Sequence, residues 1–256
     1  MTTDLTVIVT AHNETLVSGP TMRSADAAIA RAEADGFTVE RIVALDAVTE
    51  ACGAYFMQDA FSHWTRVHLD ERDLGRTRNV MLPRTSGRYI AFLDSDDMFS
   101  ENWLAEGIKV LNAAEAAGEK IIAHPELNWI FDGSNSVFAK PDQDSPIFSP
   151  YFFYVSNYYD SLCMTPRQCH LDHPYVHRDI PNGLSFQDWQ FAIETMDAGW
   201  KHVAVEDTII FKRRRESSLV TESRDRQAIV RAVPAMAVES VRSLGRPARA
   251  VSARES

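Results

Sequence analysis

The chain has 256 residues, of which 45% are hydrophobic, so it can bury one substantial core as one large domain or two fused lobes. Its formal net charge of -10 argues against a protein that wraps nucleic acid, because neutralising phosphates takes a surplus of lysine and arginine. Three cysteines at irregular spacing, with no basic-then-apolar leader before them, favour a cytoplasmic protein without a disulfide framework.

The first hundred residues alternate short apolar runs with amphipathic stretches. We expect strands at residues 5–10, 39–45, 65–69 and 89–93, separated by helices at residues 24–34, 50–61 and 74–83. This alternation predicts right-handed crossovers and a mostly parallel sheet in an α/β fold. The carboxyl ends of such strands share one edge, where ligands bind. The polar residues expected at this edge are His12, Asn13, Glu14, Asp46, residues 70–73 and residues 94–97.

The second half of the chain has a different texture. A helix is expected at residues 103–117, whereas residues 124–182 are rich in aromatics, prolines and turn formers. This composition is typical of a second lobe with long loops, built on the same sheet. Its aromatic side chains could bind sugar rings, fill a core or make a homodimer contact. Beyond it we expect a helix at residues 186–198, strands at residues 203–205 and 208–211, and a basic run at residues 212–215.

The strongest local feature is the acidic run Asp94-Ser95-Asp96-Asp97, which follows an apolar strand. Three carboxylates this close disfavour joint ionisation, so a cation is expected beside them. Oxygen ligands suit Mg²⁺ or Mn²⁺, ions that usually share their coordination shell with substrate phosphates. The alternative is an acidic, solvated turn at the start of the next helix.

Four segments in this order resemble the signatures of family 2 glycosyltransferases with the GT-A fold. They are residues 5–14 (LTVIVTAHNE), 75–79 (GRTRN), 87–97 (GRYIAFLDSDD) and 187–189 (QDW). The resemblance spans most of residues 5–219. It implies a Rossmann-like, mostly parallel sheet flanked by helices, with a C-terminal acceptor-side lobe. Residues 1–100 would then form the nucleotide-sugar-binding half, residues 101–220 the acceptor-binding and catalytic half, and residues 221–256 a helical or partly disordered tail.

The resemblance also implies an activity and the residues that carry it. A hexosyl group would pass from a nucleotide-diphosphate sugar, by resemblance a UDP-sugar, to a carbohydrate or glycoconjugate hydroxyl with inversion, as in polysaccharide biosynthesis. Asp188 corresponds to the general base, and Asp96 with Asp94 to the ligands of Mn²⁺ or Mg²⁺, while Trp189 and Asp97 lie on the acceptor side. The donor-binding residues it implies are Thr10, His12, Asn13, Glu14, Asp46, Arg78, Asp94, Ser95, Arg213 and Arg215.

Three departures from the family pattern and one alternative stay open. Ala47 follows Asp46 where relatives often have a second acid, Gln187 stands where many have glutamate, and no histidine accompanies Arg215. Without the resemblance, Asp188 would be interpreted as a helix cap or a surface carboxylate at the start of its helix.

Other classes of protein share parts of this pattern. A haloacid-dehalogenase-like phosphotransferase also ends a strand in Asp-x-Asp, but it favours Thr or Val where Met98 stands. A nucleotidyltransferase would need a glycine-rich loop before His12, and a non-catalytic carbohydrate-binding module would not need Asp188. The apolar and arginine residues of residues 226–244 could dock on anionic lipid at the inner face of the membrane or pack on the protein.

Overall fold

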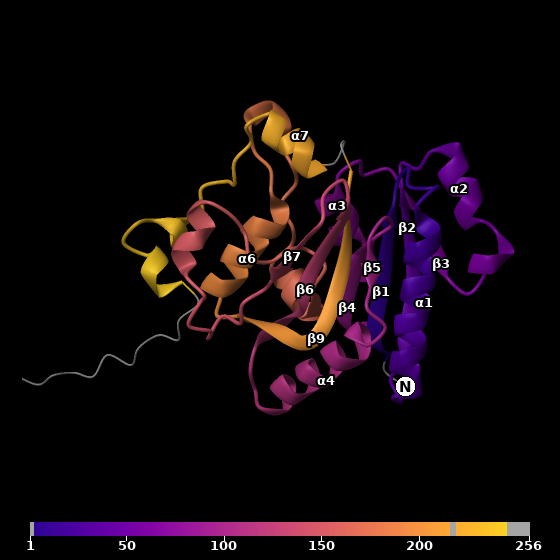
Figure 1. Cartoon of the computed structure of the whole chain (residues 1–256), viewed down its shortest axis with the longest axis horizontal. Helices are drawn as coiled ribbons and strands as arrows, with labels where there is room; N and C mark the ends of the chain where they lie inside the picture. The colour runs from indigo at the N-terminus through magenta and orange to yellow at the C-terminus, as the bar shows by residue number, and fades with distance from the viewer. Residues whose placement is uncertain (1–2, 216–218, 245–256) are drawn as a thin grey trace, which may run out of the picture.

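The structure is a computed structural model that describes residues 3–215 and 219–244. A nine-stranded sheet runs through its centre with helices on both faces (Figure 1). The strands are β1 (Thr3–Ala11), β2 (Val39–Asp46), β3 (Thr65–Leu69), β4 (Gly87–Asp94), β5 (Met98–Phe99), β6 (Ile121–Asp132), β7 (Ser136–Ala139), β8 (Met164–Pro166) and β9 (Lys201–Arg214). The helices are α1 (Ser18–Ala34), α2 (Glu50–Phe56), α3 (Leu74–Met81), α4 (Trp103–Ala116), α5 (Arg167–Asp172), α6 (Gln187–Asp197) and α7 (Leu219–Asp225).

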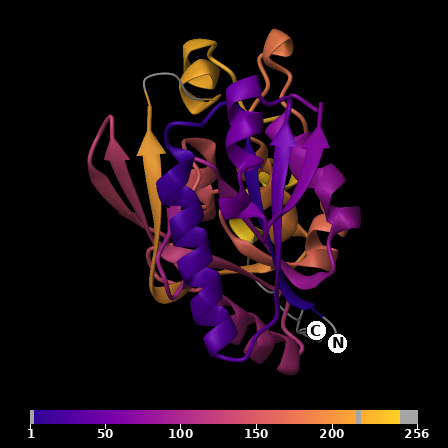
Figure 2. The same ribbon diagram turned by 90° about the vertical axis from the view of Figure 1, so that its right-hand side faces the viewer.

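The sheet order is β3-β2-β1-β4-β8-β6-β9-β5, with β7 paired to β6. Strands β1 to β4 are parallel, β8 runs antiparallel to both β4 and β6, and β9 is parallel to β6. The carboxyl ends of β1, β2, β3, β4, β6 and β9 therefore meet at one edge, to which the arrowheads of the purple strands and of orange β9 point in Figure 2. The mostly parallel α/β sheet expected from the sequence is confirmed.

The apolar strands of the first half are buried because helices cover both of their faces. Leu5, Val7 and Val9 of β1 pack with residues of α1, α2 and α4 in one core cluster. Ile8 of the same strand points to the opposite face, where α3, α5 and α6 contribute to a second cluster. This alternation along β1 explains why its sequence is continuously apolar rather than apolar at every second position.

The second half contains more strand than the sequence predicted. Long loops were expected at residues 124–182, but this part of the chain contains most of β6 and all of β7. The strands expected at residues 203–205 and 208–211 are parts of the single strand β9. β6 and β9 pair from Ile121↔Lys201 to Asp132↔Arg214, with a register shift between Pro125 and Leu127. Such a shift interrupts the period-2 pattern of a strand, which explains why β6 does not alternate in sequence.

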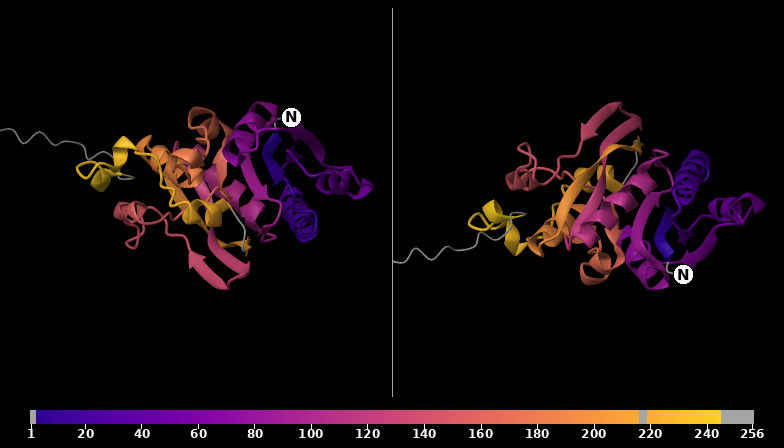
Figure 3. Two further views of the ribbon diagram at one scale, coloured as in Figure 1. Left: turned by 90° about the horizontal axis from the view of Figure 1, so that it is seen from above. Right: turned by 90° about the horizontal axis from the view of Figure 1, so that it is seen from below.

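Residues 226–244 fold back on the second half of the chain, at the end of the molecule away from α1 (Figure 3). Short 3₁₀ turns at Pro150–Tyr154 and Pro234–Met236 join α6 in a third apolar cluster, which also includes Leu244, just after the 3₁₀ turn at Val241–Ser243. Two further 3₁₀ turns precede β3 and β4, at Asp59–Phe61 and Leu82–Arg84, and another lies before α6, at Ile180–Asn182. Within residues 3–215 and 219–244, no helix is long and apolar enough to cross a membrane.

Candidate active site

The carboxyl end of β4 places Asp94 beside a buried arginine from α3. Nη2 of Arg78 donates to Oδ1 of Asp94 at 2.7 Å, and the Thr10 hydroxyl donates to the same oxygen at 2.9 Å. Arg78 is only 2% exposed, and its guanidinium lies over the rings of Phe92 and Tyr175, at 5.4 and 5.6 Å from their centroids. Burial alone would lower the pKa of Arg78, but the facing Asp94 carboxylate outweighs it and the pKa is raised. Arg78 therefore stays charged and holds Asp94 in place.

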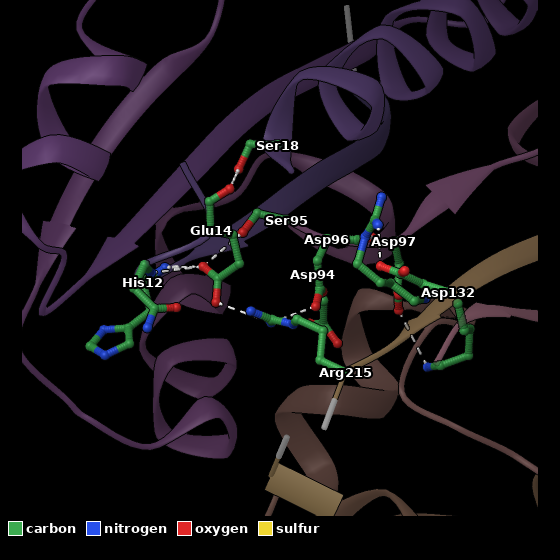
Figure 4. Close-up of polar contacts among 12 residues, drawn as sticks. His12, Glu14, Ser18, Asp94, Ser95, Asp96, Asp97, Asp132 and Arg215 are labelled. Atoms are coloured by element: carbon green, nitrogen blue, oxygen red, sulfur yellow. Dashed lines mark hydrogen bonds and ion pairs between the residues drawn. The ribbon is translucent and has the colours of Figure 1, made fainter. Parts of the chain in front are cut away.

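The loop after β1 brings Glu14 to the same edge, next to the acidic run (Figure 4). Oε2 of Glu14 accepts the backbone N–H groups of His12 and Asn13 at 2.8 and 2.9 Å and the hydroxyl of Ser95 at 3.0 Å. Its other oxygen lies 3.5 Å from Nη2 of Arg215. Three of the predicted donor-site residues thus hold the carboxylate of a fourth, Glu14, whose other oxygen faces the guanidinium of Arg215.

Arg215 occupies the space between Glu14 and the acidic run. Its Nη2 donates to Oδ2 of Asp96 at 2.5 Å (Figure 4). Burial raises the pKa of Asp96, the neighbouring Asp94 raises it further, and Arg215 opposes both. In this structure a side chain supplies the positive charge that the acidic run was expected to require.

Asp97 points away from this edge into the protein. It is 4% exposed; its Oδ1 accepts the backbone N–H of Arg213 at 2.8 Å, and Nζ of Lys212 lies 3.5 Å from its Oδ2. Burial raises the pKa of Asp97 to about 7. Arg213 in turn pairs with Asp132 at 2.6 Å and stacks on Phe131 at 4.8 Å from the ring centroid. Both of Asp97's oxygens are engaged, so its predicted place on the acceptor side stays a prediction.

Asp46, predicted to contact the donor's base, is engaged by the protein itself. Its Oδ1 accepts the backbone N–H groups of Glu71 and Arg72 at 2.7 and 3.3 Å, and its Oδ2 accepts the hydroxyl of Thr77 at 2.7 Å. The carbonyl of Asp46 lies 2.9 Å from Nδ1 of His12. In this structure Asp46 fixes the loop between β3 and α3 against the loop after β1.

Asp188 lies in the first turn of α6, whose N-cap Phe186 has a left-handed backbone with φ of 65°. Its Oδ1 accepts the N–H of Trp189 at 2.9 Å. Burial raises the pKa of Asp188, and Asp160 raises it further against the opposing charges of Lys212 and Arg78. A carboxyl group whose pKa is moved towards neutral suits proton transfer near neutral pH, so the structure gives Asp188 a property that a general base needs.

The two neighbours of Asp188 have separate roles. Nε2 of Gln187 lies 3.3 Å from Oδ1 of Asp73, which also caps α3 through the N–H of Arg76 at 2.9 Å. A glutamate at position 187 would instead set a second carboxylate against Asp73, and this accounts for the amide here. Trp189 meets Phe186 edge to face, with ring centroids 5.8 Å apart, and packs against the third apolar cluster.

Several residues of the site carried no signal in the sequence. Tyr175, on whose ring Arg78 lies, exchanges two backbone hydrogen bonds with the side chain of Asn79, at 2.7 and 2.9 Å. Lys140 and Asp160 form a buried ion pair beneath Lys212. These residues come from loops without a recognisable motif, and only the folded chain brings them together.

The oxygen ligands at this edge fit a divalent ion that a phosphate also coordinates. The contacts described above leave Oδ2 of Asp94 and Oδ1 of Asp96 without a partner among the described residues. In the part of the chain that the structure describes, no three His, Cys, Asp or Glu side chains are grouped to hold a metal by themselves. Mg²⁺ and Mn²⁺ are commonly held by one or two carboxylates together with substrate phosphates, and Asp94 with Asp96 meets that requirement.

Comparison with known proteins identifies the fold and a family. Residues 6–143 match the family model described as Glycosyl transferase family 2. Two structures of similar fold are TarS 1-349 of S. aureus in complex with UDP-GlcNAc, at 14% identity and a TM-score of 0.55, and GalNAc-T7 with UDP, GalNAc and Mn²⁺, at 13% and 0.59. A third is the mannosyltransferase PcManGT of Pyrobaculum calidifontis with GDP-Man and Mn²⁺, at 14% and 0.57.

These likenesses confirm the expected GT-A fold, although the chain is shorter than the proteins it resembles. It is covered over 84%, 84% and 85% of its length by the three structures, and it spans 60%, 44% and 59% of theirs, respectively. No curated protein matches the chain in sequence.

Proposed function

The chain belongs to glycosyl transferase family 2, and from this premise we propose that it transfers a sugar from a nucleoside-diphosphate sugar to an acceptor hydroxyl with inversion. The observation that carries the proposal is the joint placement of Asp94, Asp96 and Arg215 at the carboxyl edge of the sheet. Family membership leaves no reason to retain a phosphotransferase or a non-catalytic carbohydrate-binding module. The pathway we propose is the synthesis of a polysaccharide or glycoconjugate.

A UDP-sugar is the donor we propose. TarS of S. aureus is described with UDP-GlcNAc and GalNAc-T7 with UDP, whereas PcManGT is described with GDP-Man. In this chain, hydrogen bonds of Asp46 with His12 and Glu71 join the loops that follow β1, β2 and β3. These loops lie where the nucleobase of the donor is expected. The diphosphate would lie towards Arg215, because guanidinium groups pair with phosphate oxygens through bidentate hydrogen bonds.

Asp94 and Asp96 are the residues we propose to hold Mn²⁺ or Mg²⁺. When bound, the ion would neutralise the charge that develops on the departing nucleoside diphosphate. Arg78 and Thr10 keep Asp94 in one orientation, and Glu14 and Asp96 share the guanidinium of Arg215. Once the diphosphate is bound, Arg215 can pair with its oxygens and release Asp96.

Asp188 is the group we propose to take the proton of the acceptor hydroxyl. A hydroxyl group is a weak nucleophile until a carboxylate removes its proton as the new bond forms. Attack from the side of Asp188, opposite the leaving diphosphate, inverts the anomeric carbon. Trp189, in the same turn of α6, is the side chain that we expect to border the acceptor.

The test of this proposal is the release of UDP from UDP-GlcNAc in the presence of Mn²⁺ or Mg²⁺. We expect Asp96→Ala to lower the rate at least about 100-fold, because losing charge stabilisation at the leaving group costs several kcal/mol. The matched control is Asp59→Ala, an exposed carboxylate in the turn before β3 that should leave the rate unchanged. Release that proceeds without a divalent ion, or that survives in Asp96→Ala, would contradict the metal-assisted mechanism.

A further inference from the structure

A row of buried charges of alternating sign runs beneath the candidate active site. Nζ of Lys140 lies 3.4 Å from Oδ1 of Asp160, and Nζ of Lys212 lies 3.6 Å from the other oxygen of Asp160. The same Lys212 nitrogen is 3.5 Å from Oδ2 of Asp97. The side chains of Lys140 and Asp97 are 0% and 5% exposed and those of Asp160 and Lys212 are 14% and 24% exposed, so water screens these charges only in part.

This row joins the two halves of the chain. Asp97 follows β4 in the donor half, whereas Lys140 follows β7 and Asp160 precedes β8 in the acceptor half. Lys212 reaches both carboxylates from β9. Asp160 is held further by the side-chain amide of Asn128 at 2.7 Å and by a backbone N–H at 3.0 Å. Charged groups buried at such a junction are costly unless they are paired, so their arrangement is strongly constrained.

Among the described residues, no hydrogen bond or ion pair joins Asp188 to this row, and the row acts on Asp188 only through its charges. After burial, the largest influences on the pKa of Asp188 are Asp160, which raises it, and Lys212, which lowers it. Arg78 of α3 also lowers this pKa, and Asp188 in turn acts on the phenol of Tyr175. Burial would lower the pKa of Lys212, but Asp160 and Asp97 outweigh it and raise that pKa, so Lys212 remains a cation.

We propose that Lys212 is a positioning residue that links Asp97 of the donor half to Asp160 of the acceptor half and sets the electrostatic environment in which Asp188 works. The inference rests on the proposed function, because it assigns Asp188 the role of base. Lys212 does not need to touch the acceptor or the donor. It acts by fixing one positive charge between two carboxylates, at the point where the two halves meet.

The two members of the central pair have opposite effects on Asp188. Removing the positive charge of Lys212 leaves Asp160 facing Asp188 with less compensation, so the proton of Asp188 is held more tightly. Removing the negative charge of Asp160 leaves two cations, Lys140 and Lys212, and the proton is held less tightly. A general loosening of the fold would not move the titration of Asp188 in opposite directions in the two variants.

The experiment is a carboxyl ¹³C NMR titration of the full chain labelled at aspartate, with the Asp188 signal assigned by its loss in Asp188→Asn. We expect the midpoint to rise by about one pH unit in Lys212→Met and to fall by a similar amount in Asp160→Asn. Lys212→Arg keeps the charge and should restore the midpoint of the wild type. The matched control is Lys201→Met, which removes an exposed lysine at the other end of β9.

The outcomes separate this inference from the proposed function. Midpoints that move in the same direction in Lys212→Met and Asp160→Asn, or that do not move, would overturn the role of Lys212. If Lys212→Met does not fold, the inference is tested by the fall of the Asp188 midpoint that we expect in Asp160→Asn. The midpoint of the pH profile of sugar transfer should shift in each variant as the NMR midpoint of Asp188 does. If the NMR midpoints shift but the pH profile does not, Asp188 is not the base, whereas the electrostatic role of Lys212 still holds.

Discussion

At the scale of single residues, the backbone before Asp188 is strained. Phe186 has a φ of 65°, a left-handed conformation that bulky residues rarely adopt and that costs on the order of 1–3 kcal/mol. It leads directly into the turn where Asp188 accepts the N–H of Trp189. Strain of this kind persists where the surrounding structure fixes the chain and often accompanies a functional site. Here it fixes where the first turn of α6 begins.

Substitution of Asp188 tests its role as the base. We expect Asp188→Asn to bind the donor almost normally and to lower transfer by about 10²- to 10⁴-fold, the usual contribution of a general base. Because the pKa of Asp188 is raised above 3.8 and the base must be deprotonated, wild-type transfer should rise with pH through a midpoint above 3.8. Steady-state rates measured as a function of pH check both points.

The same helix offers a control for Asp188. Asp197 is an exposed carboxylate in the last turn of α6, so Asp197→Asn should leave the rate and its pH profile unchanged. Transfer that is undiminished in Asp188→Asn would rule out the proposed role.

If Asp96 holds the metal ion as proposed, Arg215 competes with that ion for the same carboxylate. Its Nη2 donates to Asp96 at 2.5 Å, so a divalent ion must displace or repel a guanidinium when no donor is bound. We expect Arg215→Gln to bind Mn²⁺ about tenfold more tightly than the wild type without nucleotide, a gain of about 1.4 kcal/mol. Calorimetric titration with MnCl₂ measures the difference. Arg214→Gln removes the neighbouring charge and is the matched control; equal affinities in the two variants would refute the competition.

At the scale of elements, a histidine pair joins β6 and β9 to α6. Nε2 of His124 lies 2.8 Å from Nδ1 of His202, whose Nε2 lies 3.0 Å from the hydroxyl of Thr195. That hydroxyl donates to the carbonyl of Phe191 at 2.6 Å, so it accepts from His202, and His202 accepts from His124. Burial lowers both pKa values, that of His202 to about 3, so both rings are neutral near pH 7.

Acid should destabilise the fold through this pair. An unfolded histidine has a pKa near 6.5, so the contribution of a neutral buried ring is complete above that pH and is lost as the pH falls towards 3. At pH 5 the loss is about 2 kcal/mol for His202. Urea unfolding at pH 7.5 and pH 5 should show that His202→Gln loses about 2 kcal/mol less than the wild type over this interval. Thr208→Val changes a buried residue of the same strand that does not ionise, so it should lose as much unfolding free energy between pH 7.5 and pH 5 as the wild type. The same loss in His202→Gln as in the wild type would contradict the mechanism.

The elements of the first half follow from the sequence, and several of the second half do not. The strands that become β1 to β4 are short apolar runs bounded by polar loops, and local pattern is enough to find them. β6 contains His124, Pro125 and Asn128, and it is a strand because β8, β9 and β7 pair with it. Tertiary pairing of this kind leaves no local period in the sequence.

The site divides in the same way. The acidic run could be placed from the sequence because every parallel strand ends at the same edge. The contacts of Asp160 could not be, because they join residues 128, 140 and 212, which are separated along the chain and belong to no motif. The hydrogen bonds that the Asp46 carboxylate accepts likewise depend on the conformation of the loop before α3, which the sequence does not reveal.

At the scale of the whole molecule, the residues after α7 complete the core of the second half. Val241 and Leu244 are 0% and 3% exposed, and the hydroxyl of Tyr154 donates to the carbonyl of Met236 at 2.7 Å. Within residues 226–244, only Ile229 and Val238 are large, exposed hydrophobic side chains. The apolar residues that suggested membrane docking are thus mostly used in packing within the protein.

Truncating a buried side chain of this segment distinguishes packing from docking. We expect Leu244→Ala to lower the free energy of unfolding by about 2–4 kcal/mol, because it removes buried methyl groups and leaves a cavity. Val238→Ala, an exposed change in the same segment, should have little effect on stability. Urea denaturation measures both variants, and sedimentation with anionic liposomes checks docking. Equal stability of the two variants, or liposome binding that is lost in Val238→Ala, would favour the membrane interpretation.

The borders of the sheet have a consequence for how the protein behaves when crowded. One border is β3, with five residues, and its Arg66 folds back to the carbonyls of Phe56 and Gln58. At the other end, the two-residue β5 pairs only with Ile210 and Phe211 of the 14-residue β9. Beside β5, the backbone N–H groups of Ile209 and Arg213 on β9 donate to the hydroxyl of Ser100 and to Oδ1 of Asp97, so this part of the border is less able to add a strand from another molecule. The short β3 and the engaged groups of β9 thereby limit aggregation through the sheet.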